Sequence, residues 1–213
     1  MSAGLDLQDI RLAIGDRVLI DSISLTVGAG ETATIMGPSG AGKSALLDYI
    51  GGHLDPAFTA SGEVRVDGQT VTRLPAERRR IGILFQDDLL FPHLTVGQNI
   101  GFGLTPSLRG AAARAAKVEA ALAQAGLAGF APRDPATLSG GQRARAALLR
   151  TLLAEPRALL LDEPFSKLDA SLRADFRRFV FGHAAARGLP VLLVTHDFAD
   201  AVAAGGPVVK IGG

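Results

Sequence analysis

Apolar and polar residues alternate along the N-terminal region, over residues 5–36. Three groups of apolar side chains are each separated by polar positions: Leu5/Leu7, Ile10/Leu12/Ile14 and Ile23/Leu25/Val27. This period of two is typical of half-buried antiparallel strands. Gly15-Asp16 predicts the turn between two of the strands, and Val64 and Val66 continue the pattern up to a second turn at Asp67-Gly68. We therefore expect an antiparallel β-subdomain at the N-terminus.

Short runs that are almost wholly apolar predict strands of another kind farther along the chain. A strand that is buried on both faces, as in the middle of a parallel sheet, shows no alternation. Ala158–Leu161 and Val191–Thr195 have this pattern, and further strands are predicted at Thr32–Met36, Ile81–Phe85 and Val208–Ile211. Helical segments separate these strands, so the sequence predicts an α/β fold with a mainly parallel sheet.

Four helices are predicted from apolar spacing and end signals: Ala45–Ile50, Ala111–Ala125, Ser139–Leu153 and Asp169–Arg187. Val118 and Leu122 lie four residues apart in the second helix and would share one face. We expect a single domain of 213 residues. Its core would come from residues 1–90 and 156–213, and a helical subdomain would be inserted at about 91–155.

A glycine-rich loop of the type that holds phosphate groups follows the first apolar strand. Its residues are Gly37-Pro38-Ser39-Gly40-Ala41-Gly42-Lys43-Ser44, which fit the pattern G-x-x-x-x-G-K-[ST]. The backbone N–H groups of such a loop and the N-terminus of the next helix face an anion together. Lys43 would reach the β- and γ-phosphates, and the Ser44 hydroxyl would bind Mg²⁺. An ordinary glycine-rich turn is the alternative, and the flanking strand and helix argue against it.

Polar side chains follow two of the apolar strands. Asp162 and Glu163 end the strand at 158–161, and His196 comes directly after the strand at 191–195. Ligands of parallel α/β sheets bind outside the carboxyl ends of the strands. Asp162 is therefore a candidate Mg²⁺ ligand, Glu163 a candidate general base, and His196 a candidate contact of the γ-phosphate. His53, His93 and His183 lack such a context and are interpreted as structural or surface residues.

Ser139-Gly140-Gly141-Gln142 has two compatible interpretations. Ser-x-x-Gln is a capping box, with which many helices begin. A helix that opens with Ser-Gly-Gly also offers uncovered backbone N–H groups to an anion. It would then be a second phosphate site in a chain that already has a first. Gln86 follows the strand at 81–85; a lone glutamine of this kind is usually a surface residue.

Composition limits the classes of partner. The 22 Lys and Arg residues balance 21 Asp and Glu residues, so the net charge of +1 gives no basic surface for nucleic acid. The chain has no cysteine, hence no disulfide and no cysteine-bound metal. No apolar run approaches the roughly 18 residues of a membrane-spanning helix, and the first residues do not form a signal peptide. Because 47% of the residues are hydrophobic and the mean hydropathy is +0.26, we expect either a large core or an apolar docking surface.

Taken together, these motifs resemble those of the nucleotide-binding subunit of an ABC transporter. The resemblance covers essentially the whole chain and rests on motifs in the family's order: Gly37–Ser44, Gln86, Leu138–Gln142, Asp162-Glu163, Ser166–Asp169 and His196. It implies a P-loop NTPase fold that hydrolyses ATP to ADP and phosphate. It also implies a head-to-tail homodimer, in which each ATP lies between the phosphate loop of one copy and the signature motif, Leu138–Gln142, of the other.

The resemblance further implies a role for each residue. The phosphate loop with Lys43 would bind ATP, while Ser44, Gln86 and Asp162 would surround Mg²⁺. Glu163 would activate the water and His196 would sense the γ-phosphate. Ser139, Gly140, Gly141 and Gln142 would close the site of the partner copy, and Asp169 would couple the two sites. The segment Gln86–Gly103 would receive the coupling helix of a permease, which places the protein at the cytoplasmic face of a membrane.

Three positions depart from the family pattern. No Phe, Tyr or Trp precedes Tyr49, and Ile14 stands near the place of the aromatic residue that usually stacks on adenine. Stacking contributes about 1–3 kcal/mol in comparable base contacts, so we expect weak discrimination between ATP and GTP. Ala45 replaces a common Thr, and Lys167 replaces a small residue of the D-loop, Ser166–Asp169. The sequence offers no physical reason for either.

The run from Asp162 to Asp169 is similar to that of binding-protein-dependent importers for thiamine, iron(III), polyamines and sulfate. Compact thiamine-type systems fit best, with an extracytoplasmic solute-binding protein as an indirect partner; the solute rests on analogy alone. The alternatives are a mechanotransmission or lipoprotein-release cassette and a soluble ATPase outside transport, against which the apolar segment Leu89–Leu104 argues. A GTPase is disfavoured because Ser166-Lys167-Leu168-Asp169, which superficially matches the base-reading pattern N-K-x-D, follows Asp162-Glu163 immediately and so stands in the wrong place. A long-coil ATPase is disfavoured because no sustained heptads separate the motifs.

Overall fold

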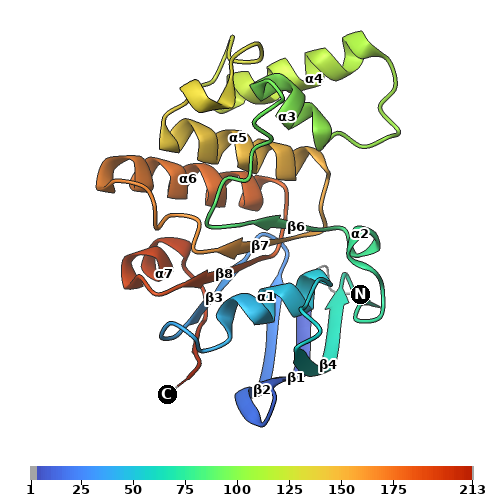
Figure 1. Cartoon of the computed structure of the whole chain (residues 1–213), viewed down its shortest axis with the longest axis vertical. Coiled ribbons are helices and arrows are strands. Elements are labelled where there is room, and N and C mark those ends of the chain that lie inside the picture. Colours follow the sequence, from blue (N-terminus) through green and yellow to red (C-terminus); the bar gives the residue numbers. More distant parts are fainter. Residues whose placement is uncertain (1–3, 213) are drawn as a thin grey trace. The chain divides into compact units, whose positions relative to one another are not determined.

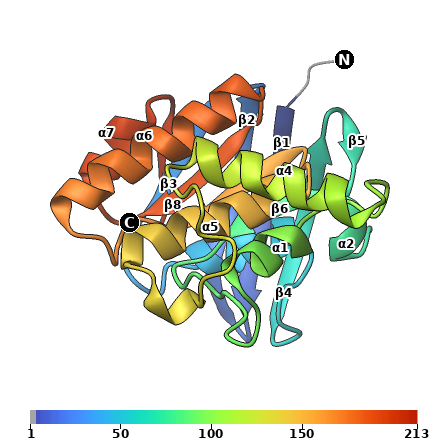
Figure 2. The ribbon, with the colours of Figure 1, turned by 90° about the horizontal axis from the view of Figure 1, so that it is seen from above.

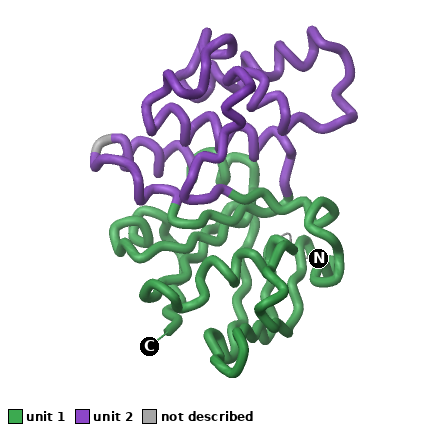
Figure 3. The backbone as a smooth tube through the Cα atoms, in the orientation of Figure 1, with its two compact units in different colours: residues 1–83, 157–163, 181–213 green, residues 84–156, 164–180 purple. Residues whose placement is uncertain are grey.

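The computed structural model describes residues 4–212, apart from the side chain of Ser171. The described chain divides into two compact units (Figure 3), one formed by residues up to 83 with 157–163 and 181–212, the other by 84–156 and 164–180. The elements in chain order are β1 (Gly4–Ile14), β2 (Arg17–Gly28), β3 (Thr32–Met36), α1 (Lys43–Gly51), β4 (Phe58–Val66), β5 (Gln69–Thr70), α2 (Ala76–Arg79), β6 (Ile81–Leu84), α3 (Val96–Phe102), α4 (Ala111–Gln124), a 3-10 turn (Pro135–Thr137), α5 (Gly140–Leu153), β7 (Ala158–Asp162), α6 (Ala170–Ala186), β8 (Val191–Thr195), α7 (Phe198–Ala204) and β9 (Val208–Lys210).

Two sheets of different kinds build the first unit (Figure 1). The antiparallel sheet has the order β2-β1-β4-β5, and the other sheet has the order β6-β7-β8-β3-β9. In the second sheet β3 pairs in parallel with both β8 and β9, and β7 pairs in parallel with β8. The predicted α/β fold, with its N-terminal antiparallel part, is therefore confirmed.

A bulge in β1 explains how its apolar residues face the core although their spacing changes. Leu5 and Leu7 occupy odd positions, whereas Ile10 and Leu12 occupy even ones, and all four are buried. The pairing with β2 shifts between Leu7 and Ile10, where Asp9 adopts a left-handed conformation with φ 49°. An extra residue in a strand reverses the side on which the following side chains lie. The sequence predicted the alternation but not this bulge.

The core of the first unit joins both sheets through helix α1. Leu46, Leu47 and Ile50 of α1 share one buried cluster with residues of β1, β2 and β4 and with residues of β3, β7 and β8. The helix begins at Lys43, two residues before the predicted start. Because α1 directly follows the phosphate loop, its packing against both sheets fixes that loop.

The second unit has a separate helical core. Residues of α3, α4 and α5 form it, among them Ile100, Leu122 and Leu149, and Figures 1 and 2 show α4 and α5 lengthwise in two perpendicular views. Helix α5 begins at Gly140, with Ser139 as its N-cap, and ends at Leu153 as predicted. Strand β6 ends at Leu84, one residue earlier than predicted. The boundary of about 91–155 for a helical subdomain stays a prediction.

No helix among residues 4–212 combines the length and the apolar character needed to cross a membrane.

Candidate functional site

The phosphate loop connects the end of β3 to the start of α1, both in the first unit. The Lys43 side chain is buried, and its Nζ donates hydrogen bonds to the Gly37 and Pro38 carbonyl oxygens, each at 2.9 Å. The lysine therefore folds back over its own loop and holds the loop curled. Its ammonium group is a compact point charge with three donors on a flexible stem, so it can exchange carbonyl partners for a phosphate.

Glycine is required at two places in this loop for different reasons. Gly42 adopts φ 89° directly before α1, a conformation that side chains disfavour. At Gly37 the reason is a close backbone contact instead: a Cβ at this position would lie 2.5 Å from the Ile211 carbonyl oxygen. The loop thus packs against the residue after β9, which itself pairs with β3.

Glu163 and His196 meet at the carboxyl ends of β7 and β8. Glu163 has φ 45°, and its N–H donates to the Val194 carbonyl oxygen at 2.9 Å. This turns the carboxylate toward His196, whose Nδ1 lies 3.0 Å from Glu163 Oε2. Both predicted residues therefore lie side by side, the glutamate mostly covered and the histidine mostly exposed. A carboxylate held in this way can orient a water molecule as well as the imidazole.

Asp162 lies at the end of β7 and contacts the start of α1. Burial raises the pKa of its carboxyl group above the ordinary value of 3.8, and the negative charges of Glu163 and Asp48 act in the same direction. A hydrogen bond with Ser44 and the charge of Lys43 oppose this shift only in part. A partly buried carboxylate beside a serine hydroxyl is a set of hard oxygen donors, which fits Mg²⁺.

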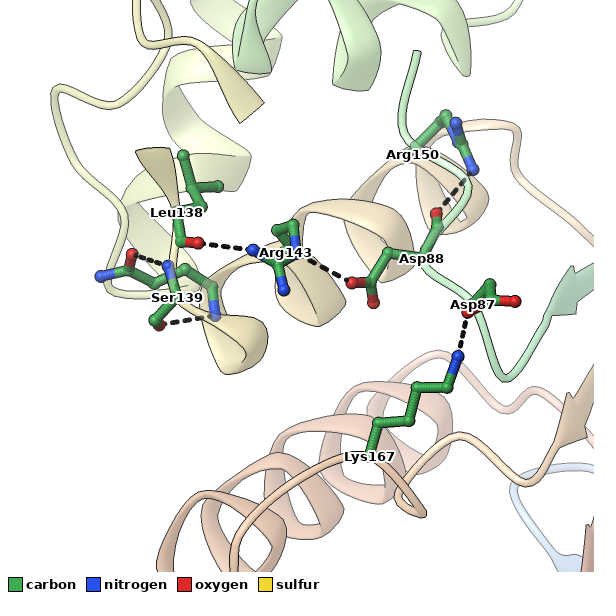
Figure 4. Close-up of polar contacts among 8 residues, drawn as sticks. Asp87, Asp88, Leu138, Ser139, Arg143, Arg150 and Lys167 are labelled. Carbon is green, nitrogen blue, oxygen red and sulfur yellow. Dashed lines mark hydrogen bonds and ion pairs between the residues drawn. The ribbon is translucent and has the colours of Figure 1, made fainter. Parts of the chain in front are cut away.

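The signature residues lie in the second unit and form the expected capping box. The Ser139 N–H donates to Gln142 Oε1 at 3.0 Å, and the Gln142 N–H donates to Ser139 Oγ at 3.4 Å. Arg143 Nη1 holds the Leu138 carbonyl oxygen at 2.7 Å, so the helix start is fixed from both sides (Figure 4). The Asp169 carboxylate accepts the Leu172 N–H at 3.0 Å, at the start of α6.

Gln86 is exposed and begins a loop that is held by three basic side chains. Lys167 forms an ion pair with Asp87, and Arg143 Nε lies 3.3 Å from Asp88 Oδ2. Arg150 Nη1 donates to the Leu89 carbonyl oxygen at 2.7 Å. Arg150 Nη2 also lies 3.3 Å from the Asp88 carbonyl oxygen, and Figure 4 shows Arg143 and Arg150 of α5 and Lys167 of the D-loop converging on Asp87 and Asp88. Lys167, which the sequence left unexplained, thus has a structural partner eighty residues away in the chain.

This loop also contains a perturbed carboxyl group that the sequence analysis did not single out. Burial raises the pKa of Asp88 above its ordinary value, and the charge of Asp87 acts in the same direction. Arg143 and Lys167 lower it in part. A cavity of about 460 Å³ lies beside the loop; Gln86, Gly140 and Leu168 contribute to its wall. Two successive aspartates after the glutamine were the one signal in the sequence for this charged cluster.

The remaining predicted histidine and base-contact positions have plain surroundings. His53 Nε2 lies 2.8 Å from Asp48 Oδ1, and the His93 ring lies 6.0 Å from the Phe91 ring. Ile14 ends β1 and is 39% exposed. The neighbouring hairpin reaches the phosphate loop, since Leu19 Cβ lies 3.0 Å from where a Cβ of Gly42 would be.

A phosphate loop after β3, with two carboxylates at the end of β7, two strands away in the same sheet, is the arrangement of a P-loop nucleoside triphosphatase. Comparison with known proteins specifies the family. The ABC transporter family model matches residues 20–166. The chain therefore belongs to the ABC transporter family, in which it is an ATP-binding subunit that hydrolyses ATP.

Three similar proteins each match most of the length of this chain. An uncharacterized ABC transporter ATP-binding protein of Escherichia coli, YnjD, is 49% identical over 91% of this chain and 88% of its own length. The thiamine import ATP-binding protein ThiQ of Escherichia coli is 47% identical, over 84% of this chain and 75% of its own length. The Fe(3+) ions import ATP-binding protein FbpC 1 of Haemophilus influenzae is 40% identical, over 95% of this chain and 61% of its own length.

Proposed function

We propose that the chain powers solute import through a membrane permease, and that two copies hydrolyse ATP at sites they share. The observation that carries this proposal is the presence of two phosphate-type helix starts in one chain, Gly42–Ser44 at the start of α1 and Ser139–Gly141 at the start of α5. A head-to-tail dimer gives each of the two ATP molecules one start from each copy. Such a dimer uses every motif of the chain twice.

Binding of ATP begins at the phosphate loop. Lys43 exchanges the Gly37 and Pro38 carbonyl oxygens, which its Nζ contacts at 2.9 Å, for the β- and γ-phosphates. The backbone N–H groups of residues 39–44 and the N-terminus of α1 supply further positive potential. The residues 139–142 of the partner copy close the site, and Asp169 links it to the second site.

Ser44 and Asp162 have the oxygen donors that would hold Mg²⁺, and Gln86 would add an amide oxygen. Held by these residues, Mg²⁺ would supply positive charge against the negative charge of the β- and γ-phosphates. Asp162 is the one ionisable group among these three ligands, and burial raises its pKa. A bound cation favours the charged form of this carboxylate and thereby offsets the cost of its burial.

Glu163 acts as the general base of the hydrolysis. It orients the attacking water and accepts its proton, while His196, 3.0 Å away, contacts the γ-phosphate. Removing a general base typically slows a reaction by about 10²–10⁴-fold. Glu163→Gln keeps the size of the side chain, so this variant should bind ATP, accumulate as a dimer and hydrolyse almost nothing.

The permease would dock on the segment Gln86–Gly103, at the cytoplasmic face of the membrane. Leu89 is 55% exposed and Phe102 is 69% exposed, which accounts for part of the apolar surplus. The names of the relatives support import, and we propose a thiamine-like solute because ThiQ, a thiamine import protein, is 47% identical. FbpC 1, which serves Fe(3+) ions at 40% identity, makes a ferric ion the competing solute.

Two measurements test this function. ATP turnover and size-exclusion chromatography with ATP compare the wild type with Glu163→Gln and with Glu119→Gln, an exposed glutamate of α4 that serves as the control. A Glu163→Gln protein that turns over at the wild-type rate would exclude Glu163 as the base. Affinity capture of the tagged chain from solubilised membranes should yield a permease and a solute-binding protein, whose affinity for thiamine and for Fe(III) then decides between the solutes. Capture of soluble partners alone would contradict a role in transport.

A further inference from the structure

A buried polar pair brackets His196 on both sides. Thr195, the last residue of β8, is 1% exposed, and Asp200, in α7, is 2% exposed. The Thr195 hydroxyl donates to Asp200 Oδ2 at 2.9 Å and accepts the Asp197 N–H at 3.0 Å. One hydroxyl thus joins the residue before His196, the residue after it and the first turn of the next helix.

The same strand end also carries the backbone of Glu163. The Glu163 N–H donates to the carbonyl oxygen of Val194, the residue before Thr195. Thr195 lies opposite Met36 in the pairing with β3, and Met36 is the last residue before the phosphate loop. A displacement of Thr195 would therefore change the position of His196 relative to both the general base and the phosphate loop.

We propose that Thr195 and Asp200 are positioning residues, which fix His196 beside Glu163 through the hydrogen bonds of the Thr195 hydroxyl. The proposal rests on the proposed function of Glu163 and His196. Neither Thr195 nor Asp200 would contact ATP. Their effect is to keep a mostly exposed histidine at one distance from its glutamate.

The burial of the pair makes this restraint strong. A hydroxyl that donates to a carboxylate makes a charge-assisted hydrogen bond, roughly twice as strong as a neutral one. Removal of the hydroxyl also leaves the Asp197 N–H without this acceptor and the Asp200 carboxylate without this donor, and buried groups that lose a partner are costly. The hydrogen bond of Asp197 Oδ1 to the Ala199 N–H at 2.8 Å would remain, so α7 can still begin.

A set of three threonine variants tests the proposal by steady-state ATP hydrolysis. Thr195→Val keeps the shape and removes the hydroxyl, so kcat should fall about tenfold to a hundredfold while KM for ATP changes less than about twofold. Thr195→Ser keeps the hydroxyl and should retain most of the activity. Thr34→Val is the matched control, because Thr34 is fully buried on the adjacent strand β3 and its hydroxyl has no hydrogen-bond partner among the described residues. It should leave kcat and KM unchanged.

A variant at the acceptor keeps the test decisive where Thr195→Val does not fold. Asp200→Asn weakens the same hydrogen bond and should lower kcat, but not raise KM. A folded Thr195→Val or Asp200→Asn protein with wild-type kcat would overturn the positioning role. A parallel rise in KM, or equal loss in Thr195→Ser, would also overturn it.

His196→Ala separates failure of this proposal from failure of the proposed function. If His196→Ala is inactive while Thr195→Val hydrolyses ATP normally, the histidine is functional and the positioning role is wrong. If His196→Ala itself hydrolyses ATP at the wild-type rate, the role assigned to His196 fails first.

Discussion

Arg79 is a buried arginine whose replacement should destabilise the first unit strongly. It is 6% exposed, and its guanidinium holds four backbone carbonyl oxygens: Leu74 at 2.8 Å, Tyr49 at 2.7 Å, Ile50 at 2.8 Å and Thr72 at 2.6 Å. Two of these oxygens belong to the last turn of α1, the helix that follows the phosphate loop. Arginine near a helix C-terminus satisfies carbonyl groups that have no partner within the helix.

The size of the effect follows from these contacts. A hydrogen bond to a charged group contributes roughly 1.5–3 kcal/mol, but the four share one guanidinium and do not add. Burial lowers the pKa of Arg79, which means that desolvation of the charge offsets part of the gain. Arg79→Met leaves four carbonyl groups without this donor, so we expect a loss of about 3–5 kcal/mol, as when one partner of a buried ionic contact is removed.

Urea unfolding followed by circular dichroism measures this loss, and thermal unfolding provides a second estimate. For a chain of this size each kcal/mol lowers Tm by about 2–4 °C, so Tm should fall by roughly 6–20 °C. The control is Arg78→Met, an exposed neighbour on α2, which should change stability by less than about 0.5 kcal/mol. Arg79→Lys should not restore stability, because an ammonium group cannot match the planar fork of donors. A loss below about 1 kcal/mol in Arg79→Met, or full rescue by lysine, would refute this reasoning.

Three further outcomes are expected. With aliphatic Ile14 in place of an aromatic residue, the ratio of kcat/KM for ATP to that for GTP should be below about tenfold; a larger ratio contradicts it. Because burial raises the pKa of Asp88, this carboxyl stabilises the fold below pH 3.8 and loses that contribution as pH rises through its folded-state pKa. Tm of Asp88→Asn relative to the wild type should therefore increase from pH 3.5 to 6.5, and a decrease would reverse the assigned sign. Lys167→Met should change the unfolding free energy by less than about 1 kcal/mol, as for an exposed ion pair, whereas Arg143→Met should lower it more in the same urea titration; equal effects would count against this ranking.

The sheets and most helices could be predicted because their signals are local. Alternation identified β1 and β2, and unbroken apolar runs identified β7 and β8, since burial on one face or on both faces leaves different patterns. The bulge at Asp9 could not be predicted, because the spacing of Leu7 and Ile10 alone does not show which of the paired strands contains the extra residue. Helix ends differed by one or two residues, as at Lys43, where the first turn of α1 overlaps the phosphate loop.

In the candidate site, too, the residues of local motifs could be predicted and the contacts between distant residues could not. Lys43, Asp162, Glu163 and the capping box at Ser139 belong to contiguous motifs, whose chemistry the residue types already define. Two of the four partners of Arg79, Tyr49 and Ile50, and the partner of Lys167 come from distant parts of the chain, and no local pattern marks them. The contact of Thr195 with Asp200 spans only five residues, yet its importance lies in burial, which depends on the packing of β8 and α7.

The polar contacts around Glu163 and His196 differ in strength from those that hold the loop beginning at Gln86. Around Glu163 and His196 the restraints are buried hydrogen bonds of Thr195 and Asp200, which break only at a large cost in free energy. Around Gln86 the loop is held by Lys167 with Asp87, an exposed ion pair, by the half-exposed Arg143 with Asp88, and by hydrogen bonds from Arg150 to the backbone of Asp88 and Leu89. The two ion pairs contribute little and respond to neighbouring charges and to salt. If a permease docks at this loop as proposed, it can therefore rearrange Gln86 at small cost, while Glu163 and His196, the groups proposed to act in hydrolysis, keep their geometry.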